Sequence, residues 1–341
     1  MNNITVVSNT TREADNGTDS PLQVDLIADG LTTGVVVNTF LIVLIVGGNF
    51  LVIAAYAKNH RLRTGTYALL VSLALSDLLV GGIAIPIRIY GSIKSWEVSV
   101  LFVSVYTAFD IFSAVTSNIH LMAISFERFI AVSRPFYHQT LTVHPYAVAS
   151  TMSWFLGIVV ASMHPANYLQ NDSDVSLTLR LIEVYSVTLF GLCFLGPLTI
   201  ITIVNIGIFR IARVLIRRDP SQHGYMGQGM LRKERKAAFT LLVMTGFFFI
   251  AWFPFFVVNM LYLYCLTCLP SSVNAQFIMV DIIKWLHYSN SAINPAIYAY
   301  RDIEMRRTFA RLLGPLGKFC GLNQVEPEPT NTQVVIDMQT R

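Results

Sequence analysis

Two acidic side chains, Asp77 and Asp110, stand inside long apolar stretches of this sequence. A charge in hydrocarbon costs several kcal/mol, so such residues face a protein interior and usually carry function. Asp110 precedes Arg128 by 18 residues, which on a helix corresponds to roughly 27 Å. If Arg128 marks the inner face of a membrane, Asp110 lies in the outer third.

Aromatic side chains are predicted to reach a similar depth from two other stretches: Trp252, Phe255, Phe256 and Tyr288. A carboxylate can pair with an ammonium group, and aromatic rings offer cation–π faces. The sequence therefore predicts a pocket for a small ligand that carries a protonated amine.

Asp77 has a different set of expected neighbours, all of which offer oxygen atoms: Ser117, Asn290, Ser291 and Asn294. Oxygen ligands around one carboxylate suit a small hydrated cation such as sodium. A water-filled polar network without a specific ion remains the alternative. We expect no other metal and no other cofactor.

Lipid is the expected solvent, because 54% of the 341 residues are hydrophobic and only 13% are charged. A span needs about 20 apolar residues. Seven stretches qualify, and they predict an all-α membrane protein with a seven-helix bundle over residues 32–299: about 32–57, 66–91, 98–127, 144–164, 181–209, 237–263 and 275–299. An enzyme is not expected, nothing suggests nucleic-acid binding, and the lack of an internal repeat disfavours repeat-built transporters.

Charge predicts the orientation, because cytoplasmic loops collect Lys and Arg. With the N-terminus outside, nineteen of the 24 basic residues fall on the inner side. The segment 1–31 is then extracellular, in agreement with its three glycosylation acceptors, Asn3, Asn9 and Asn16. We expect a multi-pass protein of the plasma membrane.

Residues 300–314 predict a short amphipathic helix on the inner leaflet, followed by a cytoplasmic tail over 315–341. Cys320 in that tail is a candidate for palmitoylation, which would add a lipid contact. Three prolines interrupt predicted spans and permit kinks: Pro197, Pro254 and Pro295.

Motifs in six of the seven stretches resemble those of the rhodopsin-like class of G-protein-coupled receptors. They are Gly48-Asn49, Leu73-Ala-Leu-Ser-Asp77, Glu127-Arg128-Phe129, Trp154, Phe248-Phe-Ile-Ala-Trp252-Phe-Pro254 and Asn294-Pro295-Ala-Ile-Tyr298, and span five carries Pro197. The resemblance covers the chain from the first span to the amphipathic helix.

The resemblance implies a mechanism and partners. Arg128 would pair with Glu234 at the base of span six in the inactive state, and activation would break this pair and swing span six outward. Phe248, Trp252 and Pro197 would couple the ligand to this motion, and Tyr298 would rotate inward. The implied partners are a small-molecule ligand, a heterotrimeric G protein, receptor kinases and arrestin.

Within the class, the biogenic-amine receptors match best. They carry an aspartate at the position of Asp110 and aromatic residues at positions that include Trp285 and Tyr288. In that group the tyrosine at the position of Tyr288 is hydrogen-bonded to the aspartate. Adenosine receptors are the alternative, because they share an asparagine at Asn259. An opsin is less expected, because Tyr288 stands at the retinal lysine position, and Lys284 is interpreted as a solvated charge at the outer rim. A transporter is also less expected, because the polar residues form no continuous path.

The sequence departs from the family at several positions. Val103 replaces the span-three cysteine, so the usual bridge to the second outer loop cannot form. Cys265 and Cys268 are expected to form a small intraloop disulfide instead, as in many amine and adenosine receptors. Asn118 replaces an apolar residue of the family's activation switch, the group of residues that couples the ligand to the motion of span six. Asn205 replaces the tyrosine of span five.

Overall fold

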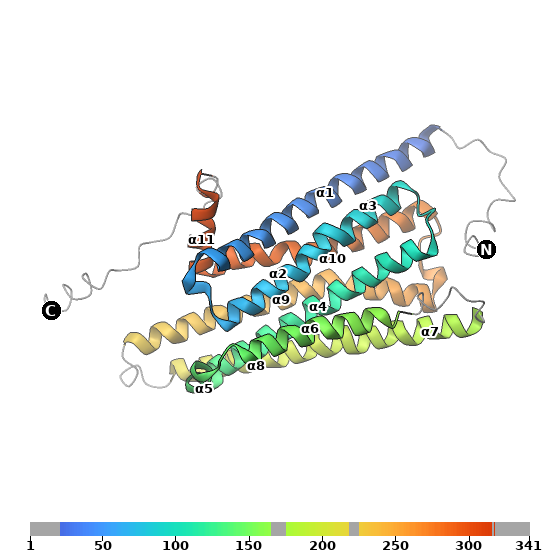
Figure 1. Ribbon diagram of the computed structural model, residues 1–341. Coiled ribbons are helices and arrows are strands. Elements are labelled where there is room, and N and C mark those ends of the chain that lie inside the picture. Colours follow the sequence, from blue (N-terminus) through green and yellow to red (C-terminus); the bar gives the residue numbers. More distant parts are fainter. Residues whose placement is uncertain (1–20, 165–174, 218–224, 316, 318–341) are drawn as a thin grey trace.

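The computed structural model describes residues 21–164, 175–217, 225–315 and 317, and all of their regular structure is helical. In parts of the helices, among them residues 225–242, only the backbone is described. Figure 1 shows long helices lying side by side in one elongated bundle, which is the architecture that the sequence predicts.

In the described residues, the bundle consists of seven helical spans, two of which are built from helices joined end to end. Two π-helical segments, η2 (Val80–Ala84) and η4 (Leu189–Leu195), join helices end to end. The α-helices are α1 (Pro21–Lys58), α2 (Gly65–Leu79), α3 (Ile85–Ile93), α4 (Val100–Ser133), α5 (Pro135–Thr140), α6 (His144–Ser162), α7 (Val175–Thr188), α8 (Gly196–Arg217), α9 (Tyr225–Tyr264), α10 (Val273–Arg301) and α11 (Ile303–Leu313). Helix α1 therefore begins inside the segment that the sequence assigned to the extracellular tail.

Six stretches of the described chain are long and apolar enough to cross a membrane, and α10 is the span that falls short of that apolarity. It is 29 residues long and packs against α1 and α9, but it carries charged residues such as Asp281 and Lys284. Polar groups in a span are tolerated where other helices enclose them. The composition of α10 thus predicts that its charges find partners inside the bundle.

The outer surface of the bundle is apolar, which is the reverse of a water-soluble protein. Phe40 and Phe50 of α1, Phe155 of α6 and Ile250 of α9 are all exposed. The interior holds buried polar residues among the apolar core, and close contacts join the helices. For example, a Cβ atom at Gly48 of α1 would lie 2.9 Å from Pro295 of α10. Only glycine permits this approach.

A buried polar group ties α2, α4 and α6 together. His120, which is fully buried, lies 2.8 Å from the Thr116 carbonyl through Nδ1 and 2.7 Å from Ser72 Oγ through Nε2. Trp154 Nε1 donates to the same Ser72 hydroxyl at 2.9 Å. Every group is satisfied if His120 is neutral with its proton on Nδ1, since Ser72 then donates to Nε2.

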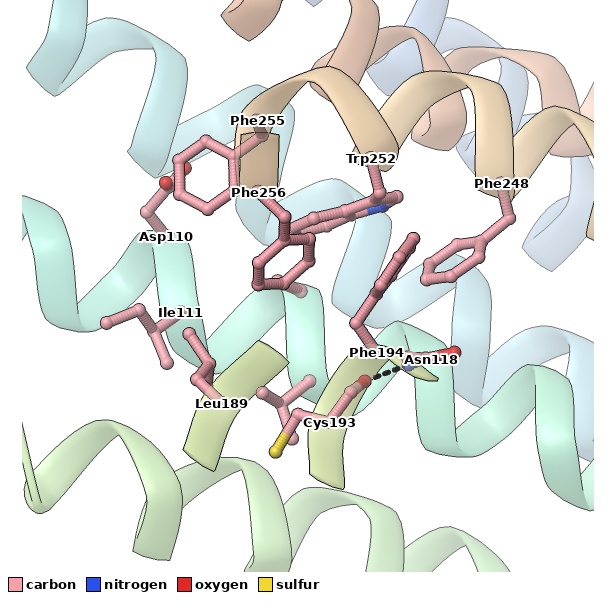
Figure 2. A pocket seen from close by; sticks show the side chains of 12 residues that line it. Asp110, Ile111, Asn118, Leu189, Cys193, Phe194, Phe248, Trp252, Phe255 and Phe256 are labelled. Atoms are coloured by element: carbon pink, nitrogen blue, oxygen red, sulfur yellow. Dashed lines mark hydrogen bonds between the residues drawn. The ribbon is translucent and has the colours of Figure 1, made fainter. Parts of the chain in front are cut away.

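Pro197 disrupts the hydrogen bonding of the fifth span, and the bundle compensates. Proline has no N–H, so the carbonyl of Cys193, four residues before it, loses its ordinary helical donor. The backbone widens into η4 just before Pro197, and the side-chain amide of Asn118 donates to the Cys193 carbonyl (Figure 2). The polar residue at position 118 therefore replaces a missing backbone donor.

Helix α11 has the amphipathic character that the sequence predicts, and it turns away from α10 at the end of the bundle (Figure 1). Asp302 caps it by accepting from the backbone N–H of Met305 at 3.0 Å. Met305 and Phe309 are buried against the main core, and α11 packs on α1 and α10. Its apolar face therefore contacts protein as well as the expected membrane surface.

Asn118→Ala should lower the stability of the protein, because it leaves the half-buried Cys193 carbonyl without its side-chain donor. The expected cost is about 1–3 kcal/mol. Thermal unfolding of detergent-purified protein measures it. Thr107→Ala is the matched control, since that hydroxyl donates to the Val103 carbonyl of its own helix. Equal stability of the two variants would contradict this role for Asn118.

Candidate functional site

Asp110 lies on α4, and its side chain is paired with a cation from α10. Its carboxylate accepts a hydrogen bond from Lys284 Nζ through Oδ2, which makes a buried ion pair. Only 6% of Asp110 and 8% of Lys284 are exposed. The other carboxylate oxygen, Oδ1, is buried and has no hydrogen-bond partner in the described part of the protein.

The expectation that Lys284 is a solvated rim charge is wrong. The lysine lies deep enough to reach Asp110, and its ammonium stands 4.7 Å from the centre of the Phe255 ring and 5.8 Å from that of Tyr106. A lysine with a four-carbon arm can carry its charge far from its own backbone. Position in the span alone therefore misjudged where the ammonium lies.

A second ion pair lies beside the first. Arg88 of α3 pairs with Asp281 of α10, and it donates to the Tyr106 hydroxyl at 3.4 Å. The Tyr106 and Tyr288 hydroxyls are 3.0 Å apart. Tyr288 thus bonds to Tyr106, and the described residues show no bond from Tyr288 to Asp110, whose Oδ2 is bonded to Lys284.

Trp96 packs against this charged cluster. Its ring lies 5.4 Å from the Tyr106 ring, and the Arg88 guanidinium stands 5.8 Å from its centre. Trp96 has a φ of 58°, a left-handed conformation uncommon for a bulky residue. A Cβ atom at Gly91 would lie 2.9 Å from the Trp96 ring, so glycine there makes room for it.

A cavity opens next to Asp110. Four predicted residues, Asp110, Trp252, Phe255 and Phe256, line it together with the switch residue Phe248. Figure 2 shows the Asp110 carboxylate beside the Phe255 ring, with the other rings continuing away from it. The remaining lining residues are Ile111, Ala114, Val115, Asn118, Leu189, Cys193 and Phe194.

Three residues that the sequence assigned to the ligand do not line this cavity: Asn259, Trp285 and Tyr288. Trp285 packs against an apolar cluster that includes Leu41 and Ile45 of α1, and the fully buried Tyr288 belongs to that cluster. His287 was not among the predicted site residues, but the centre of its ring lies 3.8 Å from that of Trp252. Its position next to Tyr288 was the available signal, since the two residues project to adjacent faces of α10.

The predicted cation site is assembled around Asp77 in the middle of the bundle. Ser291 and Ser117 donate to its Oδ1 at 2.7 and 3.3 Å, and Asn294 donates to Oδ2 at 2.9 Å. Asn290 is buried on α10, the helix that carries Ser291 and Asn294, but it is not part of this hydrogen-bonded group. Two buried oxygens, Asn49 Oδ1 and Tyr298 OH, have no protein partner in the described region.

Comparison with known proteins places this geometry in a family. Residues 48–298 match the 7 transmembrane receptor (rhodopsin family) domain, which covers most of the chain. The chain belongs to the rhodopsin family of seven-transmembrane receptors. It is therefore a G-protein-coupled receptor with a small-molecule ligand, not an enzyme.

Several curated relatives are similar over most of their length. The receptor is 33% identical to the histamine H2 receptor of Cavia porcellus over 307 residues, which is 87% of this chain and 83% of that one. It is 31% identical to the human histamine H2 receptor, with 88% and 84% covered. A D(1)-like dopamine receptor of Oreochromis mossambicus is 30% identical, with 91% and 85% covered. These relatives do not favour the adenosine alternative.

A third group of charges lies at the end of the bundle away from Asp110. Glu127 accepts from the Thr66 hydroxyl at 2.6 Å and from His138 Nε2 at 2.7 Å through Oε1. Its Oε2 lies 3.3 Å from Arg128 Nε. The expected partner of Arg128, Glu234, has a side chain outside the described residues, so the Arg128–Glu234 pair stays a prediction.

The remaining predicted residues are accounted for as follows. Pro254 and Pro295 lie inside α9 and α10, whereas Pro197 lies in the first turn of α8. Cys265 and Cys268 form a disulfide around the turn between α9 and α10. Asn3, Asn9, Asn16 and Cys320 lie outside the described residues.

Loss of one member of the Asp110–Lys284 pair should destabilise the receptor, since the other charge stays buried alone. Asp110→Asn and Lys284→Gln should each cost about 3–5 kcal/mol, and the neutral double variant should recover most of that loss. Thermal unfolding of purified receptor measures all three.

Lys94→Gln is the control for this series, because Lys94 is exposed in the loop after α3. If the two single losses simply add in the double variant, the residues are not a pair.

Proposed function

We propose that this receptor binds a protonated amine from the extracellular side through Asp110 and then activates a heterotrimeric G protein. One observation carries the proposal: a buried carboxylate with an unpartnered oxygen borders an aromatic cavity. A ligand ammonium can make a charge-assisted hydrogen bond to that oxygen. Phe255, Phe256 and Trp252 would enclose the apolar body of the ligand.

The relatives support this ligand class, since they are named for histamine and dopamine, which are both amines. The cavity wall of η4 offers Leu189 and Cys193, neither of which carries a hydroxyl group. A ligand without paired ring hydroxyls therefore fits this wall better than a catechol.

A continuous series of rings leads from the cavity toward the inner end. Phe256 is 6.1 Å from Trp252, Trp252 is 5.8 Å from Phe248, and Phe194 is 5.8 Å from Phe248, measured between ring centres. Asn118 holds the η4 backbone beside this stack. A ligand that shifts Trp252 would change the packing of α9 on α8, which is the kind of two-state element that signalling requires.

The receptor is a multi-pass protein of the plasma membrane. We propose an extracellular N-terminus glycosylated at Asn3, Asn9 and Asn16, and a cytoplasmic C-terminus with palmitoylated Cys320. The 19-to-5 distribution of Lys and Arg supports this orientation. Receptor kinases and arrestin are the further proposed partners of the inner side.

Sodium is the proposed ion of the Asp77 site, where it would favour the inactive state. The hydroxyl oxygens of Ser117 and Ser291 lie next to the carboxylate, and the unpartnered Asn49 Oδ1 is buried nearby on α1. Hard cations take such oxygen ligands and complete their shell with water.

Asp110→Ala should weaken agonist potency roughly 30-fold to several thousand-fold. The basis is the loss of one partner of a buried charge pair, about 2–5 kcal/mol, at 1.4 kcal/mol per tenfold change. Second-messenger output at matched surface expression measures the shift. If the best agonist carries no positive charge, or if the variant responds with unchanged potency, the amine proposal is wrong.

Asp77→Asn should abolish the sodium dependence of agonist affinity, because it removes the only carboxylate among the residues that surround the proposed ion. Agonist binding at two sodium concentrations, with potassium replacing sodium to hold ionic strength, measures the effect. A variant that keeps full sodium sensitivity would place the ion elsewhere.

A further inference from the structure

Two charges at the ligand site neutralise each other before any ligand arrives. Asp110 accepts from Lys284, and Arg88 pairs with Asp281 next to them. The cluster therefore contains two acids and two bases, and its net charge is zero. Both members of the Asp110–Lys284 pair are more than nine-tenths buried, so solvent water stabilises neither charge.

A ligand with only an ammonium group would upset this balance. If it displaced Lys284 from Asp110, the lysine would stay buried as an unpaired cation, and breaking a buried pair in this way is strongly unfavourable. The other nearby acid, Asp281, is held by Arg88. If the ammonium instead bound Asp110 Oδ1 beside Lys284, two cations would share one carboxylate.

A ligand that also carries an acidic group would leave every charge paired. Its ammonium would donate to Asp110 Oδ1, the oxygen without a partner, and its acidic group would accept from the Lys284 ammonium. Lys284 has three donors, of which the structure uses one on Asp110. The charges would then alternate around the site, and the cluster would remain neutral.

We propose that the natural ligand is a zwitterion, with an ammonium group for Asp110 and a carboxylate or similar acidic group for Lys284. This inference rests on the proposed function and narrows it from amines in general to amines that also bear an acid. Phe255 borders both groups, since it lines the cavity and its ring lies 4.7 Å from Lys284 Nζ. The apolar part of the ligand is expected to lie on that ring and on Trp252.

Matched ligand pairs test the inference, because an amine and its α-amino acid differ only in the carboxylate. Histamine with histidine, tyramine with tyrosine, and tryptamine with tryptophan form such a panel. On the unmodified receptor, we expect the amino acid of the most active pair to have a half-maximal concentration at least tenfold lower than that of its amine. On Lys284→Gln the order should reverse, since the amine then leaves no cation unpaired.

Lys94→Gln, an exposed lysine on the outer side, is the control and should keep the order of the unmodified receptor. Surface expression is matched in all variants, and Lys284→Met serves as a second neutral variant if Lys284→Gln is poorly expressed. An amine that is as potent as its amino acid on the unmodified receptor, with no change on either Lys284 variant, overturns the zwitterion and leaves the amine function standing. Silence of every pair on every variant overturns both.

Discussion

Asp110 and Lys284 bring a negative and a positive charge into the outer half of a bundle that is surrounded by lipid, and each makes the other tolerable. Their pairing joins α4 to α10, the span that is too polar to count as an apolar membrane helix by itself. Arg88 and Asp281 repeat the arrangement one layer away and join α3 to α10. Asp110 also lines the cavity, so the first pair connects α10 to the cavity wall. Because a buried charge without a partner is costly, any ligand at this site must satisfy both members of the pair that it disturbs.

The same constraint recurs at three depths along α4. Asp110 marks the outer level, Ser117 contributes to the hydrogen bonds around Asp77 at the middle, and Glu127 gathers Thr66, His138 and Arg128 at the inner end. Directly after Ser117 along α4, Asn118 supplies the donor that Pro197 removes from the neighbouring span. Helix α4 therefore contributes a polar side chain to each of these three groups.

Much of this arrangement could be predicted from the sequence. The apolar stretches predicted the helical bundle. Asp77 and Asp110 predicted two of its three polar levels, because an acid in hydrocarbon has few structural uses. The cavity residues Asp110, Trp252, Phe255 and Phe256 were also predicted together. Lys284 and Tyr288 were misjudged, because helical rise measures the depth of a Cα atom and says nothing about where a long side chain places its charge. The contacts of Asn118 could not be predicted either, since they depend on a carbonyl that is freed by a proline in a different span.

The pairing of Asp110 with Lys284 is tested most directly by an experimental structure of the unliganded receptor in a lipid nanodisc, at a resolution that shows side chains. We expect Lys284 Nζ to lie within hydrogen-bonding distance of the Asp110 carboxylate and the Tyr288 hydroxyl to be bonded to Tyr106. A structure in which Lys284 extends to the outer solvent and Tyr288 is bonded to Asp110 would contradict it.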